Sequence, residues 1–322
     1  MSAFSSIRCQ EIAVGVLERA LQGRLASAYL FEGPSGVGKE RAALALAKEA
    51  IGPSAGARID HGTHPDVRIF RPRDEGHRNI KVEVLREEIL RYAEFAPFES
   101  DAAFLIFPEA DISFPEAHAE GANALLKTLE EPKKGVTFVM LSERPDRLLP
   151  TIRSRCQRLR FSRLTTEVVE EILEAEGVED DEVRATAAAL ADGRADRALK
   201  LATDGAATEL FELALRVDKA AQGNRPGALI AAAEELARHD DLLLALDTLC
   251  LFYRDVAAAA LGMGESALRF RRQASVIRER ACIGARRASE RVALMQQVLL
   301  DLEANGQKQM TMDALLHRMR AA

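Results

Sequence analysis

The sequence Gly33-Pro34-Ser35-Gly36-Val37-Gly38-Lys39-Glu40 decides the fold of the first half of the chain. It follows a short apolar run at residues 28–31 and precedes an alanine-rich helical pattern at residues 41–50. Strand, glycine-rich loop and helix are the context that a phosphate-binding loop needs. The glycines let backbone N–H groups turn inward around phosphate oxygens, and Lys39 adds a positive charge beside the helix N-terminus. The predicted nucleotide-binding residues are therefore Gly33, Gly36, Gly38 and Lys39.

One position in this loop departs from the pattern. The residue after the lysine is normally Ser or Thr, whose hydroxyl holds Mg²⁺, but here it is Glu40. Its negative charge stands where a triphosphate would sit, and Coulomb repulsion should weaken binding. Because Lys39 and the glycines are kept, binding of ATP or ADP without turnover stays open, but no cofactor is firmly predicted.

The composition is that of an ordinary soluble globular protein of two or three domains, with 322 residues, 48% hydrophobic and 29% charged. A net charge of -6 argues against binding nucleic acid mainly through bulk electrostatics. The four cysteines are scattered without a C-x-x-C pair, which favours reduced thiols. No signal peptide and no apolar run of about 20 residues is found, so we expect a cytoplasmic protein without membrane contact.

The hydrophobic pattern changes character after Ser162. Up to about residue 161, apolar runs such as residues 102–107 and 136–141 alternate with helical patterns. This alternation predicts a doubly wound α/β domain with a mainly parallel sheet. Beyond it only helical periods are found, broken by glycines. We therefore predict an ATPase-like domain at residues 1–163, a small helical domain at 164–205 and a second helical domain at 206–322.

Four phrases in this order resemble one family closely: Ser-Ala-Tyr-Leu-Phe at 27–31, Gly-Thr-His-Pro-Asp at 62–66, Asn-Ala-Leu-Leu-Lys-Thr-Leu-Glu-Glu-Pro at 123–132 and Leu-Leu-Pro-Thr-Ile-Arg-Ser-Arg-Cys-Gln at 148–157. The chain resembles the bacterial DNA polymerase III clamp-loader ATPases of the AAA+ class. The resemblance is strong over the first 160 residues and weak in the helical remainder.

The resemblance implies an architecture, partners and a task. The P-loop AAA+ domain would be followed by a helical lid and by a helical collar that joins five subunits, including gamma/tau ATPases and delta, in an open ring. Such a loader opens a ring-shaped sliding clamp and places it on primer-template DNA, driven by ATP at subunit junctions.

Two departures and one retained arginine select a branch of this family. Matching to the family pattern puts Pro108 where an Asp would hold Mg²⁺, with Glu109 beside it, which is a second loss of a metal ligand after Glu40. The resemblance gives Arg155 the role of an arginine finger, catalytic in trans on the nucleotide of a neighbouring subunit. The loss of metal ligands together with the retained arginine favours the delta-prime branch over gamma/tau. We therefore predict that the chain has no catalytic activity when isolated, and that it is a subunit of the DNA-directed DNA polymerase complex in which partner subunits hydrolyse ATP.

Several alternatives remain open. Arg155 could be one of many surface arginines, with Arg153 and Arg158 close by. The chain could instead be an autonomous AAA+ ATPase of replication or repair, including a gamma/tau-like one, or a nucleotide-independent scaffold. Arg197, in a segment that resembles the family's sensor, would either approach a nucleotide or pair with an Asp.

Three smaller expectations concern zinc, a loop and a thiol. Residues 50–61 lack the four cysteines of a zinc knuckle that the family often carries, and His61 and His64 are too few ligands, so we predict no zinc and no metal. Residues 112–120 would form a surface loop longer than the family pattern. Cys156 is expected to be a small buried residue.

Overall fold

The computed structural model describes residues 2–72, 80, 85–114, 119–203, 205–303 and 307–321. The chain divides into two units, Met1–Leu164 and Thr165–Ala322, each of which is described by itself. The first unit contains both helices and strands, and the elements described in the second unit are all helices. The expected fold class is confirmed. Whether residues 164–205 and 206–322 are separate lid and collar domains stays a prediction.

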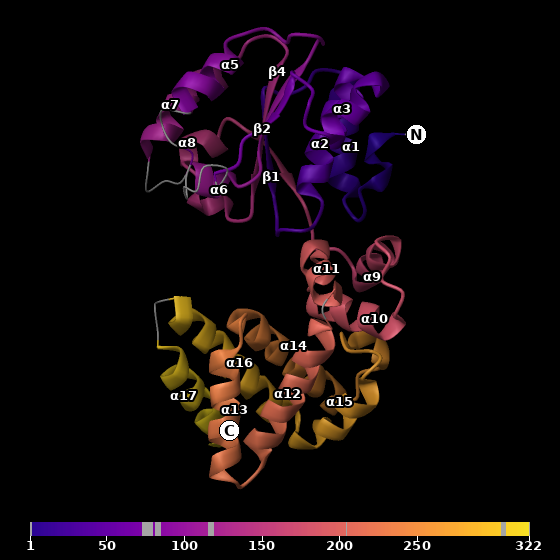
Figure 1. The fold of residues 1–322 in the computed structure, drawn as a ribbon, viewed down its shortest axis with the longest axis vertical. Helices are drawn as coiled ribbons and strands as arrows, with labels where there is room; N and C mark the ends of the chain where they lie inside the picture. The colour runs from indigo at the N-terminus through magenta and orange to yellow at the C-terminus, as the bar shows by residue number, and fades with distance from the viewer. Residues whose placement is uncertain are drawn as a thin grey trace. The chain divides into compact units, whose positions relative to one another are not determined.

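A five-stranded sheet forms the centre of the first unit (Figure 1). Its strands are β1 (Ala28–Glu32), β2 (Val67–Ile69), β3 (Ala103–Phe107), β4 (Val136–Ser142) and β5 (Gln157–Arg160). They lie in the order β2-β3-β4-β1-β5, and every described pair is parallel. The first strand therefore lies between two later ones, with Ala28 opposite Phe138 of β4. Strands β1, β3 and β4 are buried along their whole length. Strands buried on both faces form continuous apolar runs in the sequence, which is why these three could be predicted.

Helices cover both faces of this sheet (Figure 1). They are α1 (Glu11–Gln22), α2 (Lys39–Ile51), α3 (Gly56–Asp60), α5 (Arg91–Ala93), α6 (Ala110–Ser113), α7 (Ala119–Glu130) and α8 (Pro150–Arg153). Because successive strand residues point to opposite faces, Tyr29 and Phe31 join one apolar cluster with α1, α2 and α3. Leu30 joins the other, with α7 and α8. The glycine-rich loop at the start of α2 and the arginine segment after α8 thus belong to helices on opposite faces.

The chain between β2 and β3 is described continuously from residue 85 onward. This part begins with a π-helical turn, Leu85–Leu90, which is followed by α5. The turn keeps Leu85 and Ile89 buried in the apolar cluster that contains α7 and α8. The surface loop expected at 112–120 is wrong at its described ends, because residues 112–113 belong to α6, residues 119–120 belong to α7 and Phe114 is buried against the sheet. Residues 115–118 lie outside the described residues.

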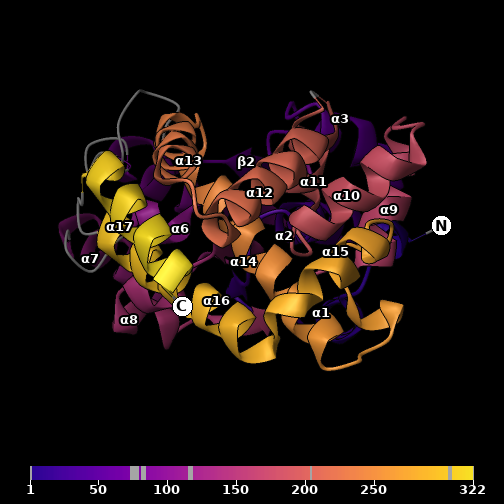
Figure 2. The ribbon, with the colours of Figure 1, turned by 90° about the horizontal axis from the view of Figure 1, so that it is seen from below.

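The second unit is a set of packed helices. They are α9 (Thr166–Ala175), α10 (Asp181–Leu190), α11 (Ala195–Thr203), α12 (Ala206–Gln222), α13 (Pro226–Arg238), α14 (Leu242–Ala260), α15 (Ala274–Arg280), α16 (Ala285–Glu303) and α17 (Lys308–Ala321). Helix α17 packs against α13 and α16, as Figure 2 shows. Across the described residues of the whole chain, no helix combines the length and apolar character that crossing a membrane requires.

A buried charge network joins four of these helices. Arg291 of α16 and Asp218 of α12 are 2% and 0% exposed, and Nη1 lies 3.1 Å from Oδ1. The hydroxyl of Tyr253 in α14 donates to the same Oδ1 at 2.8 Å and accepts from Arg291 Nη1 at 3.0 Å. Arg291 Nε donates to the carbonyl of Met319 in α17 at 3.2 Å. Burial, then the Asp218 charge, raises the pKa of Tyr253 well above its ordinary value. A buried charge is tolerated only when it is paired and hydrogen-bonded in this way.

Candidate functional site

The glycine-rich loop joins β1 to α2 as the sequence predicts. Gly33 has φ +150°, and a Cβ added there would lie 2.3 Å from the carbonyl oxygen of Phe161. Gly36 and Gly38 also have positive φ, and Gly38 is the left-handed residue directly before α2. L-residues with a side chain rarely adopt these angles, so glycine at the three positions is required by the backbone path itself.

Lys39 is turned back onto its own loop. Its side chain is buried, and Nζ donates to the carbonyl of Gly33 at 2.6 Å and to that of Pro34. In a nucleotide-loaded loop this ammonium would face phosphate oxygens. A nucleotide entering here would therefore compete with two bonds that the lysine already makes within the loop.

Glu40 is held by a cation outside the loop. Its Oε1 lies 2.6 Å from Arg71 Nη2, and both side chains are exposed. The carboxylate thus occupies the place of the Mg²⁺-binding hydroxyl and is engaged by an arginine just after β2. This pair lowers the local negative charge that Glu40 would otherwise direct at a phosphate.

The second departure from the family pattern, Pro108 in place of an Asp, lies at the carboxyl end of β3 next to that of β4. Pro108 directly follows β3, so a carboxylate is missing from the strand end where the family pattern places one. Asp111, in α6, accepts a 3.3 Å hydrogen bond from the backbone N–H of Glu143. Ser142, the last residue of β4, is 1% exposed, and its hydroxyl has no hydrogen-bond partner. Among the described residues no group of three His, Cys, Asp or Glu side chains is placed to hold a metal ion.

Arg155 follows α8 and is engaged by an acidic residue of α7. Its Nε donates to Glu130 Oε1 at 2.8 Å, and Nη2 donates to the same oxygen. Its Nη1 donates to the carbonyl of Thr151 at 2.9 Å. The structure does not bring Arg155 together with Lys39. Strands β1 and β5 are parallel, and Lys39 follows the carboxyl end of β1 whereas Arg155 precedes the amino end of β5. Helices α8 and α2 also cover opposite faces of the sheet (Figure 1). An arginine in this position does not complete the chain's own loop.

Two residues close to Arg155 in the sequence, Cys156 and Arg158, make other contacts. Arg158 of β5 makes a two-point ion pair with Glu32 at 2.5 and 2.9 Å. Cys156 is buried, as expected, and burial, followed by the charge of Glu32, raises the pKa of its thiol to about 12. Arg158 is thus tied to a carboxylate of the sheet, and Cys156 has no thiolate character near neutral pH.

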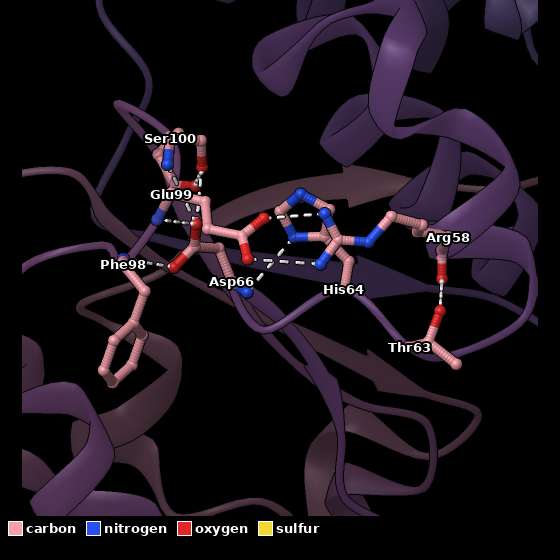
Figure 3. Close-up of polar contacts among 8 residues, drawn as sticks. Arg58, Thr63, His64, Asp66, Phe98, Glu99 and Ser100 are labelled. Carbon is pink, nitrogen blue, oxygen red and sulfur yellow. Dashed lines mark hydrogen bonds and ion pairs between the residues drawn. The ribbon is translucent and has the colours of Figure 1, made fainter.

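The Gly-Thr-His-Pro-Asp phrase organises a neighbouring segment (Figure 3). Asp66 is fully buried and accepts backbone N–H bonds from Phe98 at 2.5 Å, Glu99 at 2.9 Å and Ser100 at 3.0 Å. The hydroxyl of Ser100 donates to it as well. Burial by itself would raise the pKa of Asp66, but these donors outweigh it and the pKa lies below its ordinary value.

Two further contacts complete this cluster (Figure 3). Arg58 of α3 pairs with Glu99 at 2.7 Å, and the backbone N–H of Asp66 donates to His64 Nδ1 at 3.2 Å. Sequence reasoning quoted the phrase but missed this role. The signal that could have revealed it is an Asp directly before a short strand in which apolar and polar residues alternate, where a carboxylate can fix the neighbouring chain segment. The cluster therefore has a structural role, because Asp66 binds the backbone N–H groups of residues 98–100.

In the second unit Arg197 pairs with an aspartate, one of the two alternatives left open by the sequence. Its Nη1 lies 3.1 Å from Asp247 Oδ2, and its side chain is 17% exposed. Two of its nitrogens, Nε and Nη2, are buried without a hydrogen-bond partner.

Comparison with known proteins gives the same family for the first unit. Residues 9–165 match the family model described as DNA polymerase III, delta subunit. DNA polymerase III subunit delta' of Bacillus subtilis is 39% identical over 160 residues, which are 47% of this chain and 46% of that protein. The delta' subunit of Pseudomonas aeruginosa is 34% identical over 142 residues, 41% of this chain and 42% of that protein.

A subunit of the other branch matches more weakly. DNA polymerase III subunit tau of Bacillus subtilis is 33% identical over 195 residues, 56% of this chain and 33% of that protein. The chain spans less than half the length of each of these three relatives.

Proposed function

Because its first unit belongs to the family of bacterial DNA polymerase III clamp-loader delta-prime subunits, we propose that the whole chain acts as such a subunit. It would not hydrolyse ATP itself, and it would supply Arg155 to the nucleotide held by a neighbouring ATPase subunit. The observation that carries the proposal is the position of Arg155, which lies away from the chain's own glycine-rich loop. A guanidinium stabilises the spread negative charge of a phosphoryl-transfer transition state.

The chain's own loop is proposed to be without turnover. Glu40 and Pro108 remove the groups that would hold Mg²⁺, and Lys39 is bonded to the loop's own carbonyls. Binding of ATP or ADP to Gly33, Gly36, Gly38 and Lys39 is the weaker possibility that the retained glycines support. No zinc is proposed.

The proposed partners are the gamma/tau ATPase subunits and delta, joined in a ring of five. Through this assembly the chain would act on the sliding clamp and on primer-template DNA. The resemblance of the four sequence phrases supports these partners, and the proposed setting is the cytoplasm.

The test is ATP turnover in a reconstituted loader whose only competent ATP site is the one beside this subunit. Arg155→Ala should lower that turnover by on the order of 10³-fold or more, and Arg155→Lys should restore little of it. Arg160→Ala, an exposed arginine at the end of β5, is the matched control and should leave turnover near that of the unchanged chain. Equal turnover with Arg155→Ala and with the unchanged chain would refute the finger role.

A second candidate is an autonomous AAA+ ATPase, which the similarity to tau and the retained Lys39 support. The isolated chain would then hydrolyse ATP, and Glu40→Thr would change little. On the proposal given first, the isolated chain shows no turnover above background.

A further inference from the structure

We propose that Glu130 is a positioning residue for Arg155, fixing the plane of its guanidinium before a neighbouring subunit arrives. This inference rests on the proposed function, because it concerns how the finger is held. Nothing in the sequence phrase around Glu130 distinguishes it from Glu131, which directly follows it. The structure separates the two, since Glu130 is the residue that engages Arg155.

The contacts hold one edge of the guanidinium and leave part of it available. Nε and Nη2 both donate to Glu130 Oε1, and Nη1 donates to the carbonyl of Thr151 at 2.9 Å. Among the described residues these bonds use three of the five N–H donors of an arginine, so two remain for phosphate oxygens. The Arg155 side chain is 33% exposed, which leaves it within reach of solvent and of a partner.

Both ends of the pair stand on fixed backbone. Leu129, beside Glu130, and Ile152, in the turn before Arg155, are buried in the same apolar cluster. The backbone N–H of Arg155 donates to the carbonyl of Ile152 at 3.0 Å. The Ser154 hydroxyl donates to the carbonyl of Thr151 at 3.1 Å. Since neither backbone can shift without disturbing the cluster, the carboxylate and the arginine start from two fixed backbone positions.

The effect on rate follows from side-chain freedom. An unrestrained arginine loses rotamer entropy when it docks on a phosphate, and the full loss corresponds to about a thirtyfold change in rate. A solvent-exposed ion pair recovers part of that loss. We therefore expect that removing Glu130 lowers turnover at the neighbouring site by about twofold to fivefold. Because a finger acts on the transition state, kcat should fall while the KM for ATP stays nearly constant.

The test uses the reconstituted loader with a single competent ATP site. Glu130→Ala should show the fall in kcat, and Glu130→Gln, whose amide oxygen still accepts hydrogen bonds, should keep more of the rate. Glu131→Ala is the matched control for loss of one negative charge and should leave kcat unchanged. In an Arg155→Ala background, Glu130→Ala should cause no further loss, because the group it positions is gone.

The outcomes separate this inference from the function on which it rests. If Arg155→Ala lowers turnover and neither Glu130 variant does, the positioning role is wrong and the finger stands. If Glu130→Ala lowers turnover equally with and without Arg155, Glu130 acts elsewhere and the inference is overturned. If Arg155→Ala itself has no effect, the proposed function fails first. Incorporation of Glu130→Ala and of Glu130→Gln into the complex, measured by gel filtration, shows that any loss is not one of assembly.

Discussion

Removing the carboxylate of Asp218 should destabilise the second unit strongly. Asp218→Ala leaves Arg291, 2% exposed, without its ion pair, and takes the acceptor from the hydroxyl of Tyr253. The Nε of Arg280 also lies 3.7 Å from the same carboxylate, so two cations lose their counter-charge. Breaking a buried pair from one side typically costs about 3–5 kcal/mol. Each 1.36 kcal/mol is a factor of ten, so the equilibrium for opening should shift by about 10²-fold to 10⁴-fold.

Native-state hydrogen exchange on the full chain measures this loss where it occurs. Helix α14 contributes Tyr253 to the network, so its amides should lose protection by about 10²-fold to 10⁴-fold. The loss is limited by the free energy of complete unfolding of the unit. The matched control is Glu235→Ala, which breaks an exposed pair with Arg216 at 2.7 Å and should cost no more than about 1 kcal/mol.

A paired substitution gives a second check. Replacing both charges, Asp218→Leu with Arg291→Met, should recover part of the stability, because the buried arginine no longer lacks a counter-charge. The rest stays lost, because the hydroxyl of Tyr253 and the side chain of Arg280 still lack the carboxylate. A loss for Asp218→Ala no larger than that of the exposed control would refute the reasoning that this network is a buried, mutually dependent set of charges.

Three further predictions concern the first unit. The pKa of Asp66 lies below its ordinary 3.8 in the folded chain, so its stabilisation is complete above about pH 4 and is lost as the pH falls through the folded-state value. The loss of hydrogen-exchange protection caused by Asp66→Asn should therefore shrink on acidification below pH 4, and a constant difference would contradict this. Native labelling with iodoacetamide, read by mass spectrometry, should modify exposed Cys282 well before Cys156, whose pKa is raised to about 12; equal rates would contradict its burial. Gly33→Ala should lower the melting temperature more than Gly38→Ala, because both carry positive φ but only at Gly33 does an added Cβ overlap neighbouring backbone. Equal shifts would show that the overlap relaxes at no cost.

The sequence predicted the elements that periodicity governs. The apolar run at residues 28–31 became β1, and the glycine-rich stretch joined it to α2 with positive φ at all three predicted glycines. These features depend on neighbours close in the chain, where alternation and backbone sterics act directly. The fold class followed from them.

The side-chain partners at the site could not be predicted in this way. Arg155 pairs with Glu130, which is 25 residues away in the sequence, and Glu40 pairs with Arg71, which is 31 residues away. Which carboxylate lies within reach of which arginine depends on how the helices pack on the two faces of the sheet. For the same reason the hydrogen bonds from Lys39 to the carbonyls of its own loop could not be predicted.

The place of β1 in the sheet has a consequence for synthesis on the ribosome. Ala28 pairs with Phe138, 110 positions later, and Tyr29 pairs with Gln157. At about 5–20 residues per second, β1 leaves the ribosome roughly 5 to 20 s before either neighbour exists. Throughout that interval a strand whose first four residues are apolar has both hydrogen-bonding edges open. The nascent chain should then be a good client for a holdase chaperone until β5 emerges, after which the central strand closes between its two late partners.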